Sequence, residues 1–201
     1  MQAPEAALRA RNLRTLALLA GLFLLPLALA FCAYYGSSWR PVGTVNHGTL
    51  ISPPRPLPPT SLPLLLPQGS SAVTSLFRDK WSLVYIGAGG CDMHCRQGLS
   101  VMRDARLALN TDAPRVAQVF LVTGECCARE FLAGQHPGLE VLDAHGADAA
   151  VLLGVFPAAA RADSLFVVDP LGNLMMSYDA RQNSRGLLED LQKLLRLSHI
   201  G

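Results

Sequence analysis

The sequence predicts an α/β fold in which one folded domain follows a single N-terminal membrane-spanning helix. After residue 70, runs rich in β-branched and apolar residues alternate with amphipathic runs of helical period. Before residue 36, an uncharged run rich in Leu and Ala has the length of a membrane span. We therefore divide the chain into a cytoplasmic N-terminus (residues 1–14), a transmembrane helix (15–35), a proline-rich tether (36–70) and one domain (71–201).

The orientation of the span follows from the charges that flank it. Residues 15–35 carry no charge and, as a helix, are long enough to cross a hydrocarbon core about 30 Å thick. Three arginines precede the segment, and the next basic residue after it is Arg40. The positive-inside rule therefore predicts a single-pass protein of the inner (cytoplasmic) membrane with its C-terminal domain on the periplasmic side. The alternatives are a cleaved signal peptide, with Ala28-Leu29-Ala30 as cleavage site, and lipidation at Cys32.

The segment after the span is expected to be a stiff tether. Eight prolines lie between Arg40 and Gly69, where they remove backbone donors and favour extended conformations. Within it, Asn46–Ile51 contains no proline. We expect this short run either as an added edge strand on the domain or as part of an unstructured spacer.

The first half of the domain is expected to contain two buried strands and a helix. Trp81–Ile86 is mostly apolar and ends in the glycine-rich turn Gly87-Ala88-Gly89-Gly90, which indicates a strand. A helix is expected at Asp92–Leu109, because apolar residues recur there at helical spacing on one face. Val116–Val122 is again mostly apolar and is expected as the second strand.

The second half continues the alternation and ends in a hairpin and a helix. We expect a short helix at Cys127–Ala133, a short strand at Leu139–Leu142 and a helix at Ala147–Gly154. A turn signal, Pro170-Leu171-Gly172-Asn173, separates strands Leu165–Asp169 and Leu174–Tyr178, and Arg185–Leu197 is amphipathic. Strand, helix, strand, helix, hairpin and helix is the order of a thioredoxin-like core, whose first two strands are parallel and joined by a crossover helix.

A Cys-x3-Cys pair, Cys91 and Cys95, opens the first expected helix. This spacing places both sulfurs on one helix face, where they can form a disulfide or bind one soft metal ion. The positive end of the helix dipole, His94 and Arg96 favour the thiolate form, whereas Asp92 opposes it. We expect both sulfurs to face solvent. The alternative is a purely structural disulfide, although so short a closed loop gives a small entropic gain.

A second pair of cysteines, Cys126 and Cys127, directly follows the second expected strand. Parallel strands end at the same edge of a sheet, so we expect this pair to lie near Cys91 and Cys95. Three roles stay open for these auxiliary thiols. They resolve a disulfide by exchange, they complete a thiolate-rich metal site, or one is a small buried hydrophobe and the other incidental.

The segment Leu83-Val84-Tyr85-Ile86-Gly87, followed by the Cys-x3-Cys pair, resembles the Sco/SenC family of cytochrome c oxidase assembly proteins. The likeness continues through Val119–Val122, Leu139–Gly154 and the Asp169–Asn173 turn. The resemblance implies a thioredoxin-like (Sco/peroxiredoxin-type) domain behind a membrane anchor, with an oxidase subunit or another assembly factor as partner. It also implies copper held by both cysteines and a histidine, or reduction of the cysteines of the oxidase copper centre.

The sequence departs from that family at the third copper ligand. The family histidine is expected near Arg161–Ser164, and no histidine occurs there. His94, inside the motif, is the substitute metal ligand that we carry forward with Cys91 and Cys95. His136 and His145 fall in loops and are expected to be ordinary surface histidines.

Three functional hypotheses follow from these observations. The chain is a Cu(I) metallochaperone, a thiol-disulfide oxidoreductase acting on the oxidase or on exported proteins generally, or a non-catalytic assembly scaffold with a degenerate site. The missing histidine favours redox chemistry or weak copper transfer. The net charge of +2 comes from scattered Arg and Lys without a long basic run, so nucleic acid is excluded as a partner.

Overall fold

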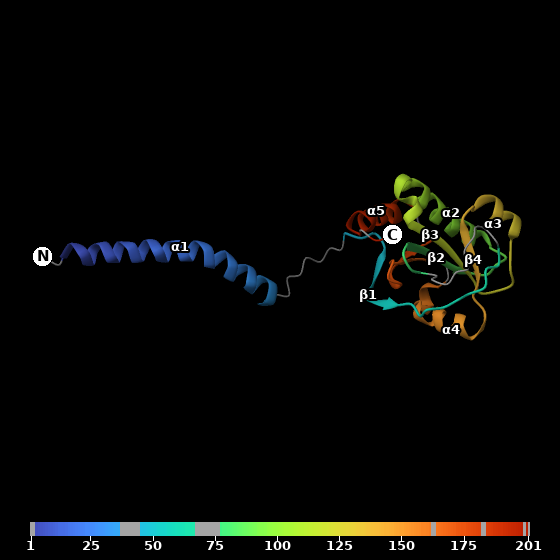
Figure 1. The fold of residues 1–201 in the computed structure, drawn as a ribbon, viewed down its shortest axis with the longest axis horizontal. Helices are drawn as coiled ribbons and strands as arrows, with labels where there is room; N and C mark the ends of the chain where they lie inside the picture. The colour runs from blue at the N-terminus through green and yellow to red at the C-terminus, as the bar shows by residue number, and fades with distance from the viewer. Residues whose placement is uncertain are drawn as a thin grey trace. The chain divides into compact units, whose positions relative to one another are not determined.

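The computed structural model describes residues 3–36, 45–66, 77–161, 164–181, 184–198 and 200. The chain forms two compact units, Met1–Val45 and Asn46–Gly201, and each is described by itself. Figure 1 shows the ribbon of both.

The first unit contains one long helix, α1 (Ala3–Gly36). Its portion Arg11–Gly36 is long and apolar enough to cross a membrane, and no other helix in the described residues meets that test. Length and composition fit both a membrane anchor and a signal sequence. The expected span, residues 15–35, lies inside this helix. Pro26 is also within it, as membrane helices tolerate.

The second unit is built on a six-stranded sheet in the order β1-β6-β5-β2-β3-β4. β2, β3 and β4 are parallel, whereas β5, β6 and β1 follow one another as antiparallel neighbours on the other side of β2. The strands are β1 (Thr49–Pro56), β2 (Trp81–Gly87), β3 (Val116–Val122), β4 (Leu139–Asp143), β5 (Ser164–Val168) and β6 (Asn173–Asp179). The predictions for β2 to β6 are therefore confirmed within one residue at each end.

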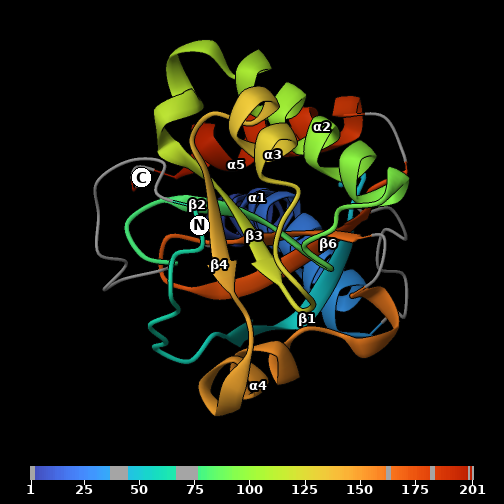
Figure 2. The same cartoon turned by 90° about the vertical axis from the view of Figure 1, so that its right-hand side faces the viewer.

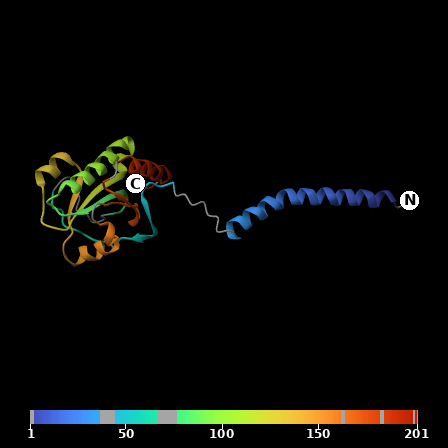
Figure 3. The same cartoon turned by 180° about the vertical axis from the view of Figure 1, so that it is seen from behind.

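Helices cover both faces of this sheet, as Figure 2 shows. On one face lie α2 (Met93–Ala108), α3 (Arg129–Gln135) and α5 (Ser184–Leu197), and on the other lies α4 (Gly146–Val155). The view from behind in Figure 3 shows the same separation, with α2 and α5 opposite α4. Short 3-10 helices η1 (Asn110–Arg115) and η2 (Ala158–Ala160) follow α2 and α4.

Each face of the sheet has its own apolar core, and β2 contributes to both. Leu83 and Tyr85 point into the core beneath α2 and α5, whereas Val84 and Ile86 point into the core beneath α4. This alternation is the period of two that any strand imposes on its side chains. A strand covered on both faces is therefore mostly apolar along its whole length, which is why β2 and β3 are visible in the sequence.

The proline-rich stretch contributes directly to the domain. β1 pairs with β6, so the edge strand expected at Asn46–Ile51 is present, beginning at Thr49 and extending to Pro56. Its prolines are compatible with an edge position, where half of the backbone donors have no strand to meet. Beyond β1, Leu57, Leu62 and Leu66 are buried. Residues 49–66 thus pack against the sheet.

Candidate functional site

The Cys-x3-Cys pair lies at the junction of β2 and α2. β2 ends at Gly87, and the Cys91 N–H donates to the Ala88 carbonyl oxygen at 3.1 Å, closing a turn. Cys91 has a positive φ of 46°, and the next residue, Asp92, is the N-cap of α2. The Cys91–Cys95 disulfide joins this turn to the first turn of the helix, with 5.0 Å between the two Cα atoms.

Polar contacts fix the beginning of α2 around the disulfide. The Asp92 carboxylate accepts a hydrogen bond from the Cys95 N–H at 2.9 Å, which satisfies one of the free donors at the helix N-terminus. The Arg96 guanidinium donates to the Cys91 carbonyl oxygen at 3.2 Å and stacks over the Phe131 ring of α3, 4.6 Å from its centroid. The turn that carries Cys91 is therefore tied to both α2 and α3.

The cysteine pair is buried, so the expectation that both sulfurs face solvent is wrong. Cys91 is 2% and Cys95 3% exposed, and both belong to the core beneath α2 and α5. A cavity of about 360 Å³ nevertheless opens beside them, and both cysteines are among its walls. The other lining residues are Tyr85, Ile86, Gly87, Ala88, Gly90 and Asp92. Both cysteines thus border a cavity of small-ligand size, although their side chains are almost wholly covered.

The second cysteine pair lies against the turn that carries the first. A Cβ on Gly89 would be 2.5 Å from the Glu125 carbonyl oxygen and 2.8 Å from the Cys126 Cα, so this close approach requires glycine. The Ala128 N–H donates to the Gly89 carbonyl oxygen at 2.8 Å. This contact holds the loop extended, and α3 begins at Arg129 rather than at Cys127 as expected.

The adjacent Cys126 and Cys127 form a vicinal disulfide. Cys126 is exposed, whereas Cys127 is partly buried and packs on the core cluster that contains Cys91 and Cys95. The expectation that parallel strands bring the two cysteine pairs to one edge agrees with these contacts. The register supports it, because the ends of β2 and β3, Gly87 and Val122, are direct partners.

The described residues contain no group of three or more His, Cys, Asp or Glu side chains arranged to hold a metal ion. His94 is exposed in the first turn of α2. Of Arg161–Ser164, where the family histidine is expected, residues 162 and 163 lie outside the described part of the chain. The soft donors near the turn are therefore the cysteine sulfurs, beside the carboxylate of Asp92.

His136 was expected to be a surface histidine, but it is buried. It is 2% exposed at the C-terminal end of α3, and its Nε2 has no hydrogen-bond partner. Its ring packs edge-on against Phe131, with 5.0 Å between centroids. Burial, reinforced by the charge of Arg103, lowers the pKa of His136 from 6.5 to about 4, although Asp104 acts in the opposite direction. Packing of α3 on the sheet, which periodicity does not reveal, buries this residue.

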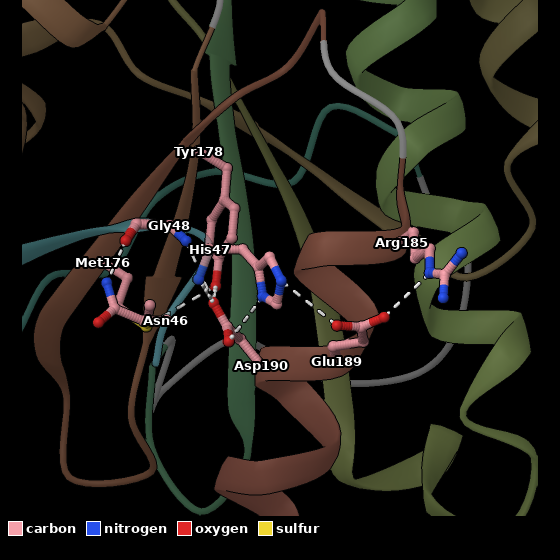
Figure 4. A network of polar contacts seen from close by, with 8 residues as sticks. All are labelled: Asn46, His47, Gly48, Met176, Tyr178, Arg185, Glu189 and Asp190. Carbon is pink, nitrogen blue, oxygen red and sulfur yellow. Dashed lines mark hydrogen bonds and ion pairs between the residues drawn. The ribbon is translucent and has the colours of Figure 1, made fainter. Parts of the chain in front are cut away.

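A polar network that the sequence analysis missed joins the start of the domain to α5 (Figure 4). The buried carboxylate of Asp190 accepts hydrogen bonds from the His47 N–H at 2.7 Å, the Gly48 N–H at 3.1 Å and the Tyr178 hydroxyl at 2.7 Å. The imidazole of His47 also lies 3.3 Å from both Asp190 and Glu189. Asp190 follows Leu187 by three positions, so an acidic residue on the apolar face of α5 was the available signal.

Charge in this network is stabilised by hydrogen bonding. Burial by itself raises the pKa of Asp190, but the hydrogen bonds from Tyr178 and from the backbone of Gly48 and His47 outweigh burial and lower it below 3.8. Burial and the neighbouring Asp190 carboxylate raise the pKa of Tyr178 well above its usual value. The hydroxyl of Tyr178 therefore stays a donor across the physiological range.

Comparison with known proteins places residues 81–198 in one family model, described as "Transmembrane-like, thioredoxin-like, C-terminal domain". Similar solved structures include apo Sco1 of Thermus thermophilus, at 23% identity, with a TM-score of 0.55 and coverage of 76% of this chain and 99% of that one. Copper-bound yeast Sco1 is 14% identical, with a TM-score of 0.53 and coverage of 61% and 82%. No curated protein sequence matches the chain.

A third similar structure is BsSco, described as a member of the Sco family of cytochrome c oxidase assembly proteins with a disulfide switch. It is 14% identical, with a TM-score of 0.53 and coverage of 75% of this chain and 99% of that one. At these identities the likeness establishes a shared fold. The α/β thioredoxin-like prediction and the Sco/SenC resemblance in structure are thereby confirmed.

Proposed function

The chain belongs to the family of transmembrane-like, thioredoxin-like C-terminal domains, and we propose that it is a membrane-anchored accessory protein for assembly of the cytochrome c oxidase copper centre. It acts through Cys91 and Cys95, by thiol-disulfide exchange, by Cu(I) handling or by both. Its partner is an oxidase subunit or another assembly factor. The support from relatives is that the similar structures are Sco proteins, one of them copper-bound and one named for oxidase assembly.

The observation that carries the proposal is the position of the Cys91–Cys95 disulfide. It lies where the central strand β2 passes into α2, beside a cavity of about 360 Å³. A purely structural disulfide has no need of a cavity. Closing a loop of only a few residues also gives less stability than a long loop would. The positive end of α2 favours the thiolate that either chemistry requires.

Thiol-disulfide exchange is favoured over copper delivery by the set of donors. Two reduced cysteines suit Cu(I), a soft ion, so the donor type fits copper as cargo. The described residues add no third His, Cys, Asp or Glu arranged with them to hold a metal ion, and His94 is exposed while both cysteines are buried. Two-electron exchange needs only the two sulfurs and a partner that carries two thiols or a disulfide.

Copper stoichiometry of the full chain in detergent, measured with and without prior reduction, separates the two chemistries. A metallochaperone binds about one Cu(I) per reduced chain through the pair, and loses it in Cys91→Ser but not in the matched control Cys32→Ser. An oxidoreductase instead exchanges with a peptide disulfide and takes up little copper. If Cys91→Ser leaves Cu(I) affinity unchanged, copper handling by this pair is excluded. If the pair cannot be reduced at physiological potentials, exchange is excluded.

The scaffold alternative is tested in cells. If Cys91→Ser/Cys95→Ser leaves oxidase assembly intact while deletion of the chain abolishes it, the cysteines are not the working part. We propose further that residues 1–14 are cytoplasmic, that residues 15–35 anchor the chain in the inner membrane and that the thioredoxin-like domain is periplasmic. An oxidising periplasm is a compartment in which a reactive disulfide pair can persist.

A further inference from the structure

We propose that Cys126 and Cys127 form a second redox couple that passes electrons from an external protein dithiol to the buried Cys91–Cys95 pair. This inference rests on the proposed exchange chemistry of Cys91 and Cys95, and it assigns the route by which a partner reaches them. Exchange at Cys91 and Cys95 does not itself require a second pair of cysteines, so the relay can be tested separately from the proposed function.

The first observation is the difference in exposure between the two pairs. Exchange requires a partner thiolate to approach a sulfur directly, yet Cys91 and Cys95 are only 2% and 3% exposed. The cavity beside them, about 360 Å³, has the volume of a small-molecule pocket. Cys126, by contrast, is exposed on the loop after β3. The Cys126–Cys127 disulfide is therefore the one that a partner protein can approach at this edge of the sheet.

The second observation is the contact between the two loops. Gly89, two residues before Cys91, lies so close to Cys126 that a Cβ would be 2.8 Å from the Cys126 Cα. Ala128 directly follows Cys127, and its N–H donates a hydrogen bond to the Gly89 carbonyl oxygen, which holds the two loops together. Cys127 packs inward on the core cluster that holds Cys91 and Cys95. One member of the couple is thus exposed, and the other is partly buried against the core cluster to which Cys91 and Cys95 belong.

The third observation is the pairing of the four cysteines. They form two disulfides, one with an exposed member, Cys126, and one buried. Two neighbouring disulfides can pass a pair of electrons from one to the other by thiol-disulfide exchange.

The exchange balances as two electrons and two protons per cycle. A partner thiolate attacks the Cys126 sulfur, forming a mixed disulfide and releasing the Cys127 thiolate. The partner's second thiolate then breaks the mixed disulfide, which leaves the partner oxidised and Cys126 and Cys127 reduced. Next, the Cys127 thiolate attacks Cys91 and releases the Cys95 thiolate. Finally, the Cys126 thiolate attacks Cys127, re-forms the vicinal disulfide and releases the Cys91 thiolate.

A trapping experiment tests whether the two couples reach each other. The full chain in detergent carries Cys32→Ser, Cys95→Ser and Cys126→Ser, so that Cys91 and Cys127 alone remain, and is oxidised with glutathione disulfide. We expect peptide mapping to show an intramolecular Cys91–Cys127 bond in most molecules. The matched control keeps Cys91 but replaces Cys127 by Ser and adds Leu107→Cys, which is exposed and lies about 21 Å along α2 from its first residue, Met93. Equal cross-linking in both chains, or none in the first, overturns the relay.

A kinetic experiment tests whether the couple carries electrons. Reduction of Cys91–Cys95 is followed with reduced thioredoxin as a protein dithiol and with dithiothreitol as a small one. In Cys126→Ser/Cys127→Ser we expect reduction by the protein to slow about ten-fold, with the dithiothreitol rate unchanged because the cavity admits it. Equal rates in wild type and variant with the protein dithiol overturn the relay and leave the proposed function standing. A wild-type pair that resists both reductants overturns the proposed function and the relay with it.

Discussion

Single buried polar residues determine how the stability of the domain changes with pH. The neutral form of His136 is favoured in the folded chain, because burial and Arg103 hold its pKa at about 4 against 6.5 when unperturbed. Between these values the unfolded chain binds more protons than the folded chain. Stability is therefore fully present above about pH 6.5 and falls as the pH drops toward 4, by up to about 3 kcal/mol.

The prediction for His136 is a loss of this pH dependence when the residue is replaced. In His136→Leu, we expect the difference between unfolding free energies at pH 7.5 and pH 4.5 to shrink by about 2 kcal/mol or more. Urea unfolding followed by circular dichroism measures it. Gln135→Leu, at the neighbouring exposed residue, which carries no titratable group, is the matched control and keeps the wild-type slope. An unchanged slope in His136→Leu would show that His136 titrates normally.

Asp190 titrates in the opposite sense and in a different range. Its pKa is held below 3.8, so its contribution to stability is present above that value and is lost only as the pH falls further. At neutral pH, Asp190→Asn replaces a buried, charged acceptor, whose Oδ2 receives three hydrogen bonds, by a neutral one, so all three charge-assisted bonds are weakened. We expect a loss of about 2 to 3 kcal/mol.

The control for Asp190 is its neighbour in α5. Glu189→Gln removes a partly exposed carboxylate whose partners are His47 and Arg185, and we expect a change within about 0.5 kcal/mol. Denaturant unfolding at pH 7 measures both variants. If the two substitutions cost the same, the buried carboxylate does not hold the start of the domain to α5.

Among the elements, the proline-rich segment differs most from its prediction, because residues 49–66 pack against the sheet and were expected to be part of a tether. Leu57 is 5% exposed and packs in the core beneath α4, although it lies in a stretch with the composition of a linker. We expect Leu57→Ala to destabilise the domain by about 2 to 4 kcal/mol, the usual cost of removing a buried leucine side chain. Leu50→Ala in the same segment, at a residue 48% exposed, is expected to change stability by less than about 0.5 kcal/mol. A neutral Leu57→Ala would mean that the segment does not pack in solution.

The elements that the sequence predicted are those whose signal is local. β2 and β3 are mostly apolar runs because both of their faces are buried, and this signal is visible in the sequence. The signals that were missed depend on packing. Burial of Cys91 and Cys95 comes from α3 and α5, and β1 was obscured because prolines are poor evidence for a strand except at an edge.

At the scale of the whole chain, long-range contacts were the least predictable. His47 and Asp190 are 143 positions apart in the sequence. His47 comes close to α5 because the strand that follows it, β1, pairs with β6. The approach of Cys126 to Gly89 was predictable, because it follows from a parallel strand pair with a known order. Topology therefore predicted which loops meet, and left open which side chains they bury.

Orientation of the chain in the membrane is a prediction for the intact molecule. Three arginines precede the uncharged span, so we expect the domain to be outside the cytoplasm and the first residues inside. The test is a chain with its five native cysteines replaced by Ser and Leu171→Cys added on the exposed turn between β5 and β6. A membrane-impermeant maleimide should label it in intact cells.

Reversing the flanking charge should reverse that result. In Arg9→Glu/Arg11→Glu/Arg14→Glu, the positive bias is lost, and labelling of the same cysteine should fall and recover when the cells are permeabilised. Arg55→Glu, in the domain, is the control and should leave labelling unchanged because it lies beyond the reach of the rule. Intact mass of the purified chain is measured alongside, since an anchor keeps residues 1–30 and a cleaved signal peptide loses them. If the Leu171→Cys chain that keeps its three arginines is labelled only after permeabilisation, the domain lies in the reducing cytoplasm. Stable disulfides are rare in that compartment.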